Sequence, residues 1–159
     1  MAALLVEGFE VYGLEPAAAQ IVEAEAAYPS LEGRITRGSL PFDLPANRSF
    51  SAVLCSAMLM HVPVPQSLEA VHALRRLLRP SGRAIVFVST GRQVDPVSFR
   101  DAEGRLFHEP CPEAVQLLFE RVGFRLRNRQ TTADRMGRSE LTWHTFIFEL
   151  RAQAALAPT

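Results

Sequence analysis

The sequence predicts an α/β fold whose sheet is mostly parallel and ends in an antiparallel strand. Strand patterns and helix patterns alternate along most of the chain, which is the order of βα units in a parallel sheet. Two consecutive strand patterns follow the last helix pattern, as in a terminal hairpin, and a hairpin adds an antiparallel strand. The first strand pattern ends at an acid, Glu15, directly before Pro16, a residue that suits a first helical turn.

The amino-terminal part of the chain holds two strand patterns around one helix pattern. Residues 9–15 predict a buried strand, the Ala-rich residues 17–27 predict a helix, and residues 34–38 predict a short strand. Residues 41–49 contain Pro, Asp and Asn and predict a loop. The apolar residues 50–56 are typical of a strand at the centre of a sheet.

The carboxyl-terminal part continues the alternation. Residues 65–78 predict an amphipathic helix that stops at the turn signal Arg-Pro-Ser-Gly, and residues 83–89 predict the next strand. Residues 112–122 predict a helix, which Gly123 would cap. The hairpin strands are expected at residues 124–130 and 141–150. The first of them would carry three arginines on one outward face: Arg125, Arg127 and Arg129.

One long polar segment, residues 91–110, interrupts this order. A connection of that length without structure of its own is typical of a functional or mobile loop. His108 and Glu109 could close over a bound molecule, although solvated loop residues are the simpler interpretation. We expect residues 1–150 to form a single domain and residues 151–159 to form a short Ala/Pro tail.

The composition excludes several kinds of chemistry. All 17 basic residues are Arg, so a Schiff-base lysine, a P-loop lysine and a Tyr/Lys catalytic pair are impossible. The formal net charge is zero, which gives no support to a nucleic-acid or membrane partner. Cys55 and Cys111 form no C-x-x-C pair, and the four His are scattered, so no metal site is expected.

The start of the chain and the length of its apolar runs bear on the cellular compartment of the protein. Residues 1–6 are too short for a signal-peptide core, and no apolar run approaches the ~20 residues that span a bilayer. A cytoplasmic protein is the simplest expectation. Cys55 lies in an apolar strand pattern, which predicts a buried, reduced thiol.

Four motifs follow one another along the chain: residues 13–16 (Gly-Leu-Glu-Pro), residues 40–42 (Leu-Pro-Phe), residues 50–62 and residues 77–83. In this order they resemble the motifs of class I S-adenosylmethionine-dependent methyltransferases. Residues 134–138 with Trp143 are also similar to the closing hairpin of one bacterial subgroup of that family. The resemblance covers about residues 3–150.

The resemblance implies a Rossmann-like methyltransferase sheet with the strand order 3-2-1-4-5-7-6 and an antiparallel seventh strand. It implies S-adenosyl-L-methionine as the cofactor, bound across the carboxyl ends of the strands. Glu15 would then hold the ribose hydroxyls, and Cys55 and Ser56 would lie near the methionine part. His61 would face the substrate and is the candidate catalytic base. The residues expected to edge the adenine are Gly38, Ser39 and Leu40.

The chain departs from the family pattern at its start. Only 14 residues precede Glu15, and none of them form the glycine-rich loop that comes about 20 residues before such an acid. Residues 1–8 resemble the end of the helix that follows that loop. The expectation is therefore a sheet missing its first strand. Gly38 and Ser39 also stand where the family often has an adenine-binding acid.

Three functions are compatible with these residues. The first is methyl transfer to an unidentified small-molecule acceptor. The second is a truncated, non-catalytic methyltransferase-like domain that persists as an interaction module or remnant. The third is a nicotinamide-dependent oxidoreductase, because an acid after the second strand also suits NAD. The absence of lysine and the hairpin with Trp143 count against the third.

Two histidines and one acid–arginine pair also have structural interpretations. His61 could simply be a loop or helix-start histidine bonded to the backbone, and a structural role is expected for His144. Asp134 and Arg138 could pair across the hairpin loop, and they are given no catalytic role.

Overall fold

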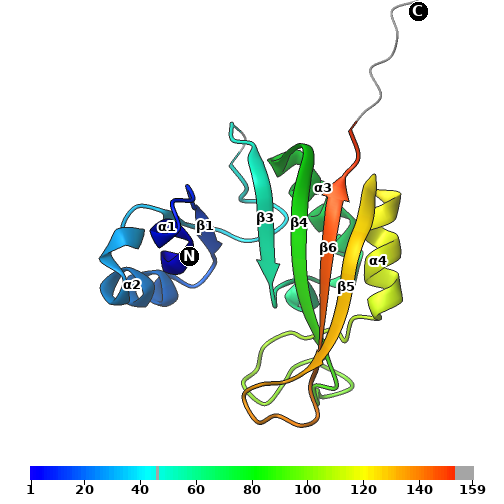
Figure 1. Cartoon of the computed structure of the whole chain (residues 1–159). Coiled ribbons are helices and arrows are strands. Elements are labelled where there is room, and N and C mark those ends of the chain that lie inside the picture. Colours follow the sequence, from blue (N-terminus) through cyan, green and yellow to red (C-terminus); the bar gives the residue numbers. More distant parts are fainter. Residues whose placement is uncertain (46, 153–159) are drawn as a thin grey trace, which may run out of the picture. The chain divides into compact units, whose positions relative to one another are not determined.

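The structure is a computed structural model that describes residues 1–45 and 47–152. The chain divides into two compact units, Met1–Pro45 and Ala46–Thr159, and each contains helices and strands (Figure 1). From residue 153 onward the expected tail lies outside the described residues. A single domain over residues 1–150 stays a prediction.

The first unit is built around a short parallel ladder. Strands β1 (Gly13–Glu15) and β2 (Ile35–Arg37) pair in parallel, with Glu15 opposite Arg37. The strand predicted over residues 9–15 is thus shorter than expected, and the side chain of Phe9 is 61% exposed. The reason is that β2 offers only three pairing positions. Three helical segments complete the unit: α1 (Ala2–Val6), α2 (Ala18–Ala27) and a 3-10 turn, η1 (Pro29–Leu31).

The second unit contains a four-stranded sheet with the order β3-β4-β6-β5. β3 and β4 are parallel, whereas β6 runs antiparallel to both β4 and β5. This order matches strands 4-5-7-6 of the expected sheet, including its antiparallel seventh strand. The strand bounds are β3 (Phe50–Ser56), β4 (Leu78–Thr90), β5 (Phe124–Ala133) and β6 (Thr142–Leu150).

Two helices, α3 (Ser67–Leu77) and α4 (Pro112–Arg121), cover one face of this sheet (Figure 1). The aromatic ring of Phe119 in α4 stacks on that of Phe148 in β6, with centroids 4.3 Å apart and planes 3° apart. Both rings are fully buried, and each such burial stabilises the fold by roughly 1.5–3 kcal/mol. Gly123 ends α4 with a φ of +97°, a left-handed conformation that glycine adopts without strain, as predicted.

Two strand predictions need correction. Among the described residues β3 pairs only with β4, so it lies at the edge of its sheet and not at the centre, and Leu54 is 56% exposed. The predicted turn after α3 is a bulge within β4. The pairing there jumps from Phe50–Leu78 to Ala52–Arg83, and Ser81 takes a φ of +61°. The helix stop was predicted correctly, but the chain pairs with β3 on both sides of the turn.

The prediction of one arginine face on β5 is wrong. The pairing of β5 with β6 shifts between Leu126 and Asn128, so Arg127 is an extra residue in the strand. Arg127 forms an ion pair with Glu149 at 2.6 Å, while the guanidinium of Arg129 lies 5.4 Å from the ring centroid of the buried Phe146. The bulge therefore places Arg129 on the helix-covered face.

Candidate functional site

Glu15 is held at the end of β1 with part of its carboxylate available. Its Oε1 accepts a hydrogen bond from the backbone N–H of Ala17 at 2.9 Å, close to the start of α2. Its backbone carbonyl accepts the N–H of Gly38 at 3.2 Å. Within the described part of the chain Oε2 has no hydrogen-bond partner. The acid is therefore oriented by its own backbone and can still accept hydrogen bonds from a ligand.

The loop after β2 lies against the same strand end. A Cβ atom on Gly38 would be 2.5 Å from Cβ of Asp43 and 2.9 Å from Cδ1 of Leu14, so only glycine fits this close approach. Ser39 donates its backbone N–H to Oδ2 of Asp43 at 3.0 Å, and Leu40 follows in the loop. The structure thus brings Glu15 together with the loop that begins at Gly38.

Asp43 is a residue that sequence reasoning missed. The family pattern places an acid before the Leu-Pro-Phe motif, and none stands there in this chain. The chain instead folds back after that motif, so that the backbone N–H of Asp43 bonds the carbonyl of Ser39 at 3.0 Å. The signal in the sequence is an Asp four residues after a Ser within a Pro-containing loop, a spacing that permits such a turn.

Cys55 and Ser56 stand at the carboxyl end of β3 with opposite exposures. The thiol of Cys55 is buried in the core beneath the helices, and this burial raises its pKa to about 12. Ser56 is exposed, because neighbouring side chains of a strand alternate between its two faces. The side chain of Cys55 is therefore closed off from a ligand, and only its main chain remains for a contact.

His61 lies in a 3-10 turn, η2 (Leu59–His61), shortly after β3. Its Nδ1 lies 2.5 Å from the carbonyl oxygen of Leu106. A carbonyl oxygen can only accept, so Nδ1 must donate and carries the hydrogen of the neutral ring. The ring also meets that of Phe107 edge-on, with centroids 5.8 Å apart. In this tautomer Nε2 carries no hydrogen, and its lone pair can accept a hydrogen bond.

Residues 91–110 form a compact loop of their own, contrary to the structureless excursion expected from the sequence. Asp95 accepts hydrogen bonds from the backbone N–H groups of Val97 and Ser98 at 3.1 and 2.7 Å. Arg100 and Leu106 form an antiparallel bridge. The ring of Phe107 is 1% exposed and anchors the segment, which we call the β4–α4 loop.

A buried carboxylate organises the middle of the β4–α4 loop. Asp101 receives hydrogen bonds from Nε of Arg105 at 2.8 Å and from the backbone N–H groups of Glu103 and Arg105. The side-chain bond from Arg105 is the main reason why the pKa of Asp101 falls to about 2. Arg92 approaches the same carboxylate at 3.4 Å, and its guanidinium lies 5.4 Å from the ring centroid of Phe107.

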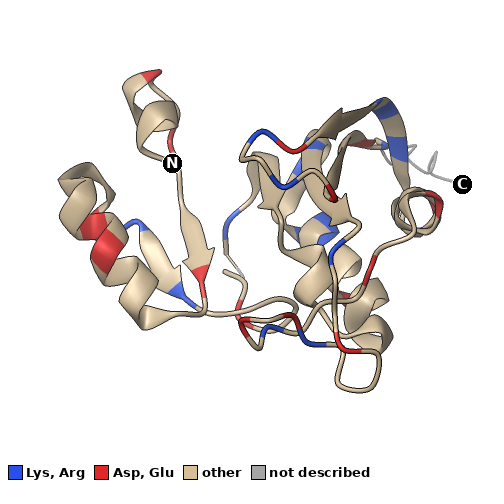
Figure 2. Ribbon diagram, turned by 90° about the horizontal axis from the view of Figure 1, so that it is seen from below, with Lys and Arg blue, Asp and Glu red and all other residues tan. Residues whose placement is uncertain are grey.

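The hairpin loop between β5 and β6 lies at the same end of the sheet as the β4–α4 loop, beyond the ends of β3 and β4 (Figure 1). Asp134 pairs with Arg138 at 2.7 Å, as predicted, and also accepts Nε1–H of Trp143 at 2.8 Å. The bond from Arg138 is the main reason why the pKa of Asp134 lies well below its usual range. Figure 2, which views this end, shows acidic and basic positions interspersed along the loops.

His108, Glu109 and His144 each have a local role. The ring of His108 lies 5.2 Å from that of Phe99, and Glu109 accepts the backbone N–H of Gly91 at 2.7 Å. His144 is buried between the hydroxyls of Thr90 and Thr131, each 3.2 Å from a ring nitrogen. Burial lowers the pKa of His144, which favours its neutral form and fits the expected structural role.

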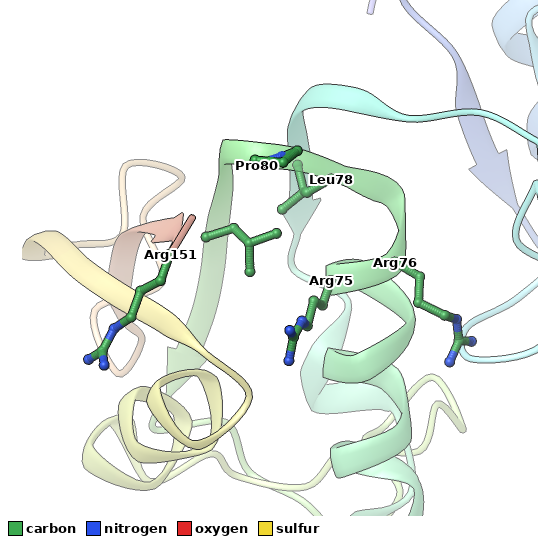
Figure 3. Close-up of a pocket in the computed structure, with 6 residues that line it drawn as sticks. Arg75, Arg76, Leu78, Pro80 and Arg151 are labelled. Carbon is green, nitrogen blue, oxygen red and sulfur yellow. The ribbon is translucent and has the colours of Figure 1, made fainter. Parts of the chain in front are cut away.

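A hollow of about 250 Å³ lies at the opposite end of this sheet (Figure 3). Leu78 and Leu150, at the start of β4 and the end of β6, help to form it. Arg75 donates from Nη1 to the carbonyl of Val122 at 2.9 Å, whereas the side chains of Arg76 and Arg151 extend outward on its two sides (Figure 3). This hollow contains none of the predicted site residues.

Residues 1–45 and 47–152 contain neither a metal-binding cluster nor a membrane-spanning helix. No group of three or more His, Cys, Asp or Glu side chains is placed to hold a metal ion. No helix in that part of the chain is long and apolar enough to cross a membrane.

Comparisons with known proteins agree with this architecture. A family model described as a methyltransferase domain matches residues 1–82. No curated protein gives a significant sequence match. An S-adenosylmethionine-dependent methyltransferase from Methanosarcina mazei is similar in structure, with 19% identity and a TM-score of 0.73. The match covers 95% of this chain and 86% of that one.

Two other solved structures are similar at comparable levels. A protein from Pyrococcus horikoshii shows 17% identity and a TM-score of 0.73, over 94% of this chain and 75% of that one. The 1,6-didemethyltoxoflavin-N1-methyltransferase of Burkholderia thailandensis shows 17% identity and a TM-score of 0.69, over 94% of this chain and 65% of that one. At such identities the likeness concerns the fold, and it confirms the predicted fold class.

Proposed function

Because the chain belongs to the methyltransferase-domain family, we propose that it transfers the methyl group of S-adenosylmethionine to a small-molecule acceptor. The observation that carries the proposal is the oriented carboxylate of Glu15, which ends β1 with one oxygen available beside the loop of Gly38. An acid at this point of such a sheet suits the two hydroxyls of a ribose. The similar enzyme from Burkholderia thailandensis was solved with bound 1,6-didemethyltoxoflavin and S-adenosylhomocysteine, which supports both parts of the proposal.

The residues of the first unit fit the adenosine part of this cofactor. Glu15 would accept the ribose hydroxyls, and the loop from Gly38 to Leu40 would edge the adenine. The close packing of Gly38 on Asp43 keeps that loop flat against the strand end. Asp43 supports the site by fixing Ser39 through its backbone N–H.

In the second unit the contributions come from Cys55, Ser56 and His61. The main chain of Cys55 and the exposed side chain of Ser56 would contact the methionine part of the cofactor. When bound, S-adenosylmethionine supplies an electrophilic methyl group on a sulfonium, so the protein's task is mainly alignment. His61 would accept the proton of the acceptor at Nε2, because Nδ1–H is fixed on Leu106.

Calorimetric titration tests the proposal. We expect S-adenosylmethionine and S-adenosylhomocysteine to bind the full chain, and NAD to show no heat of binding. Glu15→Gln should weaken S-adenosylmethionine binding while leaving the unfolding midpoint nearly unchanged. Binding of NAD alone would support an oxidoreductase, and binding of none of the three would support a non-catalytic module.

A further inference from the structure

The structure assigns a second ligand contact to Arg92: we propose that its guanidinium binds the carboxylate of the methyl acceptor, so that the acceptor is a small carboxylic acid. This inference rests on the proposed methyl transfer and adds a substrate class to it. Arg92 was no candidate at the level of sequence. Its place one residue after Gly91, at the carboxyl end of β4, brings it to the same end of the sheet as His61.

Arg92 and His61 share one neighbour, the buried ring of Phe107. The guanidinium of Arg92 lies 5.4 Å from the ring centroid, and the imidazole of His61 packs against the ring at 5.8 Å. Both side chains are thus anchored on one ring at this end of the sheet, and the proposed acceptor would bond to Arg92 and present its methylated atom to Nε2 of His61. Phe107 fixes both side chains, because its own ring is 1% exposed.

The hydrogen-bonding capacity of Arg92 is only partly used. Nε of Arg92 is buried and has no hydrogen-bond partner among residues 1–45 and 47–152. Nη1 has one long contact, 3.4 Å, with Asp101. Buried donors are nearly always satisfied, so an orphaned guanidinium nitrogen calls for an explanation.

Asp101 does not supply the missing partner. Its carboxylate already receives Nε–H of Arg105 at 2.8 Å and two backbone N–H groups of the same loop. Arg92 thus shares Asp101 with a nearer arginine, Arg105, and has only the 3.4 Å contact to that carboxylate. The side chain of Arg92 as a whole is 20% exposed, so solvent and solutes can reach part of it, although Nε is buried.

The geometry favours a carboxylate over other anions. A guanidinium presents paired N–H donors in a plane, which match the two oxygens of a carboxylate. A phosphate dianion would call for a second free cation, and the nearby Arg105 is engaged with Asp101 and Glu103. One available guanidinium over an aromatic ring is thus suited to a singly charged, planar group.

Nuclear magnetic resonance on the full chain with ¹⁵N-labelled arginine tests this assignment directly. The probe is benzoate, with benzamide as its neutral counterpart of equal size. We expect benzoate to shift the Nε–H resonance of Arg92 in a saturable manner and benzamide to leave it in place. An unmoved resonance, an equal response to benzamide, or a response to inorganic phosphate alone would overturn the proposal.

Substitutions of Arg92 provide a second test of the proposal. Arg92→Gln should weaken benzoate binding at least tenfold, whereas Arg92→Lys should retain part of it. The matched control is Arg135→Gln, since Arg135 is exposed in the hairpin loop and outside the site. Unchanged benzoate affinity in Arg92→Gln would refute the proposal. If that variant does not fold, the titration of the unaltered protein decides.

The two proposals can fail separately. Titration with S-adenosylmethionine is run on the same samples. Binding of the cofactor without any benzoate effect at Arg92 would leave methyl transfer standing and remove the carboxylate acceptor. Benzoate binding at Arg92 without cofactor binding would remove the proposed function and with it the acceptor role of this site.

Discussion

The backbone N–H of His108 donates a 2.8 Å hydrogen bond to the carbonyl oxygen of Met60. A second bond runs beside it, from Nδ1 of His61 to the carbonyl of Leu106. Together they join the turn after β3 to the β4–α4 loop at two neighbouring positions. The orientation of the His61 ring is therefore set by a segment 45 residues further along the chain.

Replacing Glu15 should weaken cofactor binding. Glu15→Ala would remove the proposed charge-assisted hydrogen bonds to the ribose, which predicts a loss of ~1.5–3 kcal/mol in binding free energy by calorimetry. Glu32→Ala is the control, because Glu32 is an exposed acid of the same unit without a hydrogen-bonded side chain among the described residues. An unchanged dissociation constant in Glu15→Ala would take Glu15 out of the site.

His61 should matter for turnover and little for cofactor affinity. His61→Asn keeps a side-chain N–H that can bond to the carbonyl of Leu106 but removes the proposed base, so kcat should fall about 10²–10⁴-fold. The assay follows transfer of a labelled methyl group to any acceptor found among small carboxylic acids. His72→Asn, on the exposed side of α3, should behave like the unaltered protein. Full activity in His61→Asn would mean that no base is needed at this position.

Two glycines of the β4–α4 loop should respond very differently to alanine. A Cβ on Gly91 would lie only 2.0 Å from the carbonyl oxygen of Glu140, whereas a Cβ on Gly104 would meet nothing within 4 Å. Both residues have positive φ, which costs alanine about 1 kcal/mol. Gly104→Ala should show only that cost in urea unfolding, and Gly91→Ala should lose about 1–3 kcal/mol more through the clash. Equal losses would contradict the packing of this loop on the hairpin loop.

Asp101 should make stability depend on pH in the acid range. Its pKa is lowered from 3.8 to about 2, so the native state holds the carboxylate ionised more strongly than the unfolded state does. The resulting stabilisation is fully present above pH 3.8 and is lost as pH falls through about 2. Thermal melts from pH 5 to 2 should therefore fall more steeply for the unaltered protein than for Asp101→Asn. Parallel curves would show that Arg105 does not hold this carboxylate.

The two cysteines should differ in reactivity towards a thiol reagent. Burial raises the pKa of Cys55 to about 12, so at neutral pH its thiol is protonated as well as inaccessible. Cys111 is exposed. We expect one fast-reacting thiol in the native protein, which Cys111→Ser removes, and a second only after denaturation. A fast phase that survives in Cys111→Ser would place Cys55 near the surface.

Local patterns in the sequence were enough to predict the order of the elements. Helix α4 was expected at residues 112–122 and is found at Pro112–Arg121, because its proline start, apolar spacing and capping glycine are all local signals. The paired acid and arginine at Asp134 and Arg138 are likewise four residues apart. The position of Glu15 at a strand end also follows from neighbouring residues alone.

The remaining features depend on partners far along the chain. β1 is short because β2 is short, and β3 is an edge strand because of how the sheet is assembled. The carboxylate of Asp101 and the ring of Phe107 give Arg92 its place, and a pattern of 3.6 or 2 residues carries no sign of either contact. The contact between Asp43 and Ser39 was missed for a similar reason. Asp43 follows the Leu-Pro-Phe motif in the sequence, and it reaches Ser39 only because the chain turns back after that motif.

The extra residue at Arg127 has a consequence for variation among relatives. Because Arg127 is the extra residue of a bulge, deleting it would restore regular pairing, with Arg129 still opposite Phe146, and would remove the ion pair with Glu149. A relative that lacks this one residue can therefore keep an arginine over the ring of Phe146 while losing the arginine that pairs with Glu149. A gap of one residue at this position would leave unchanged which side chains of β5 face α4.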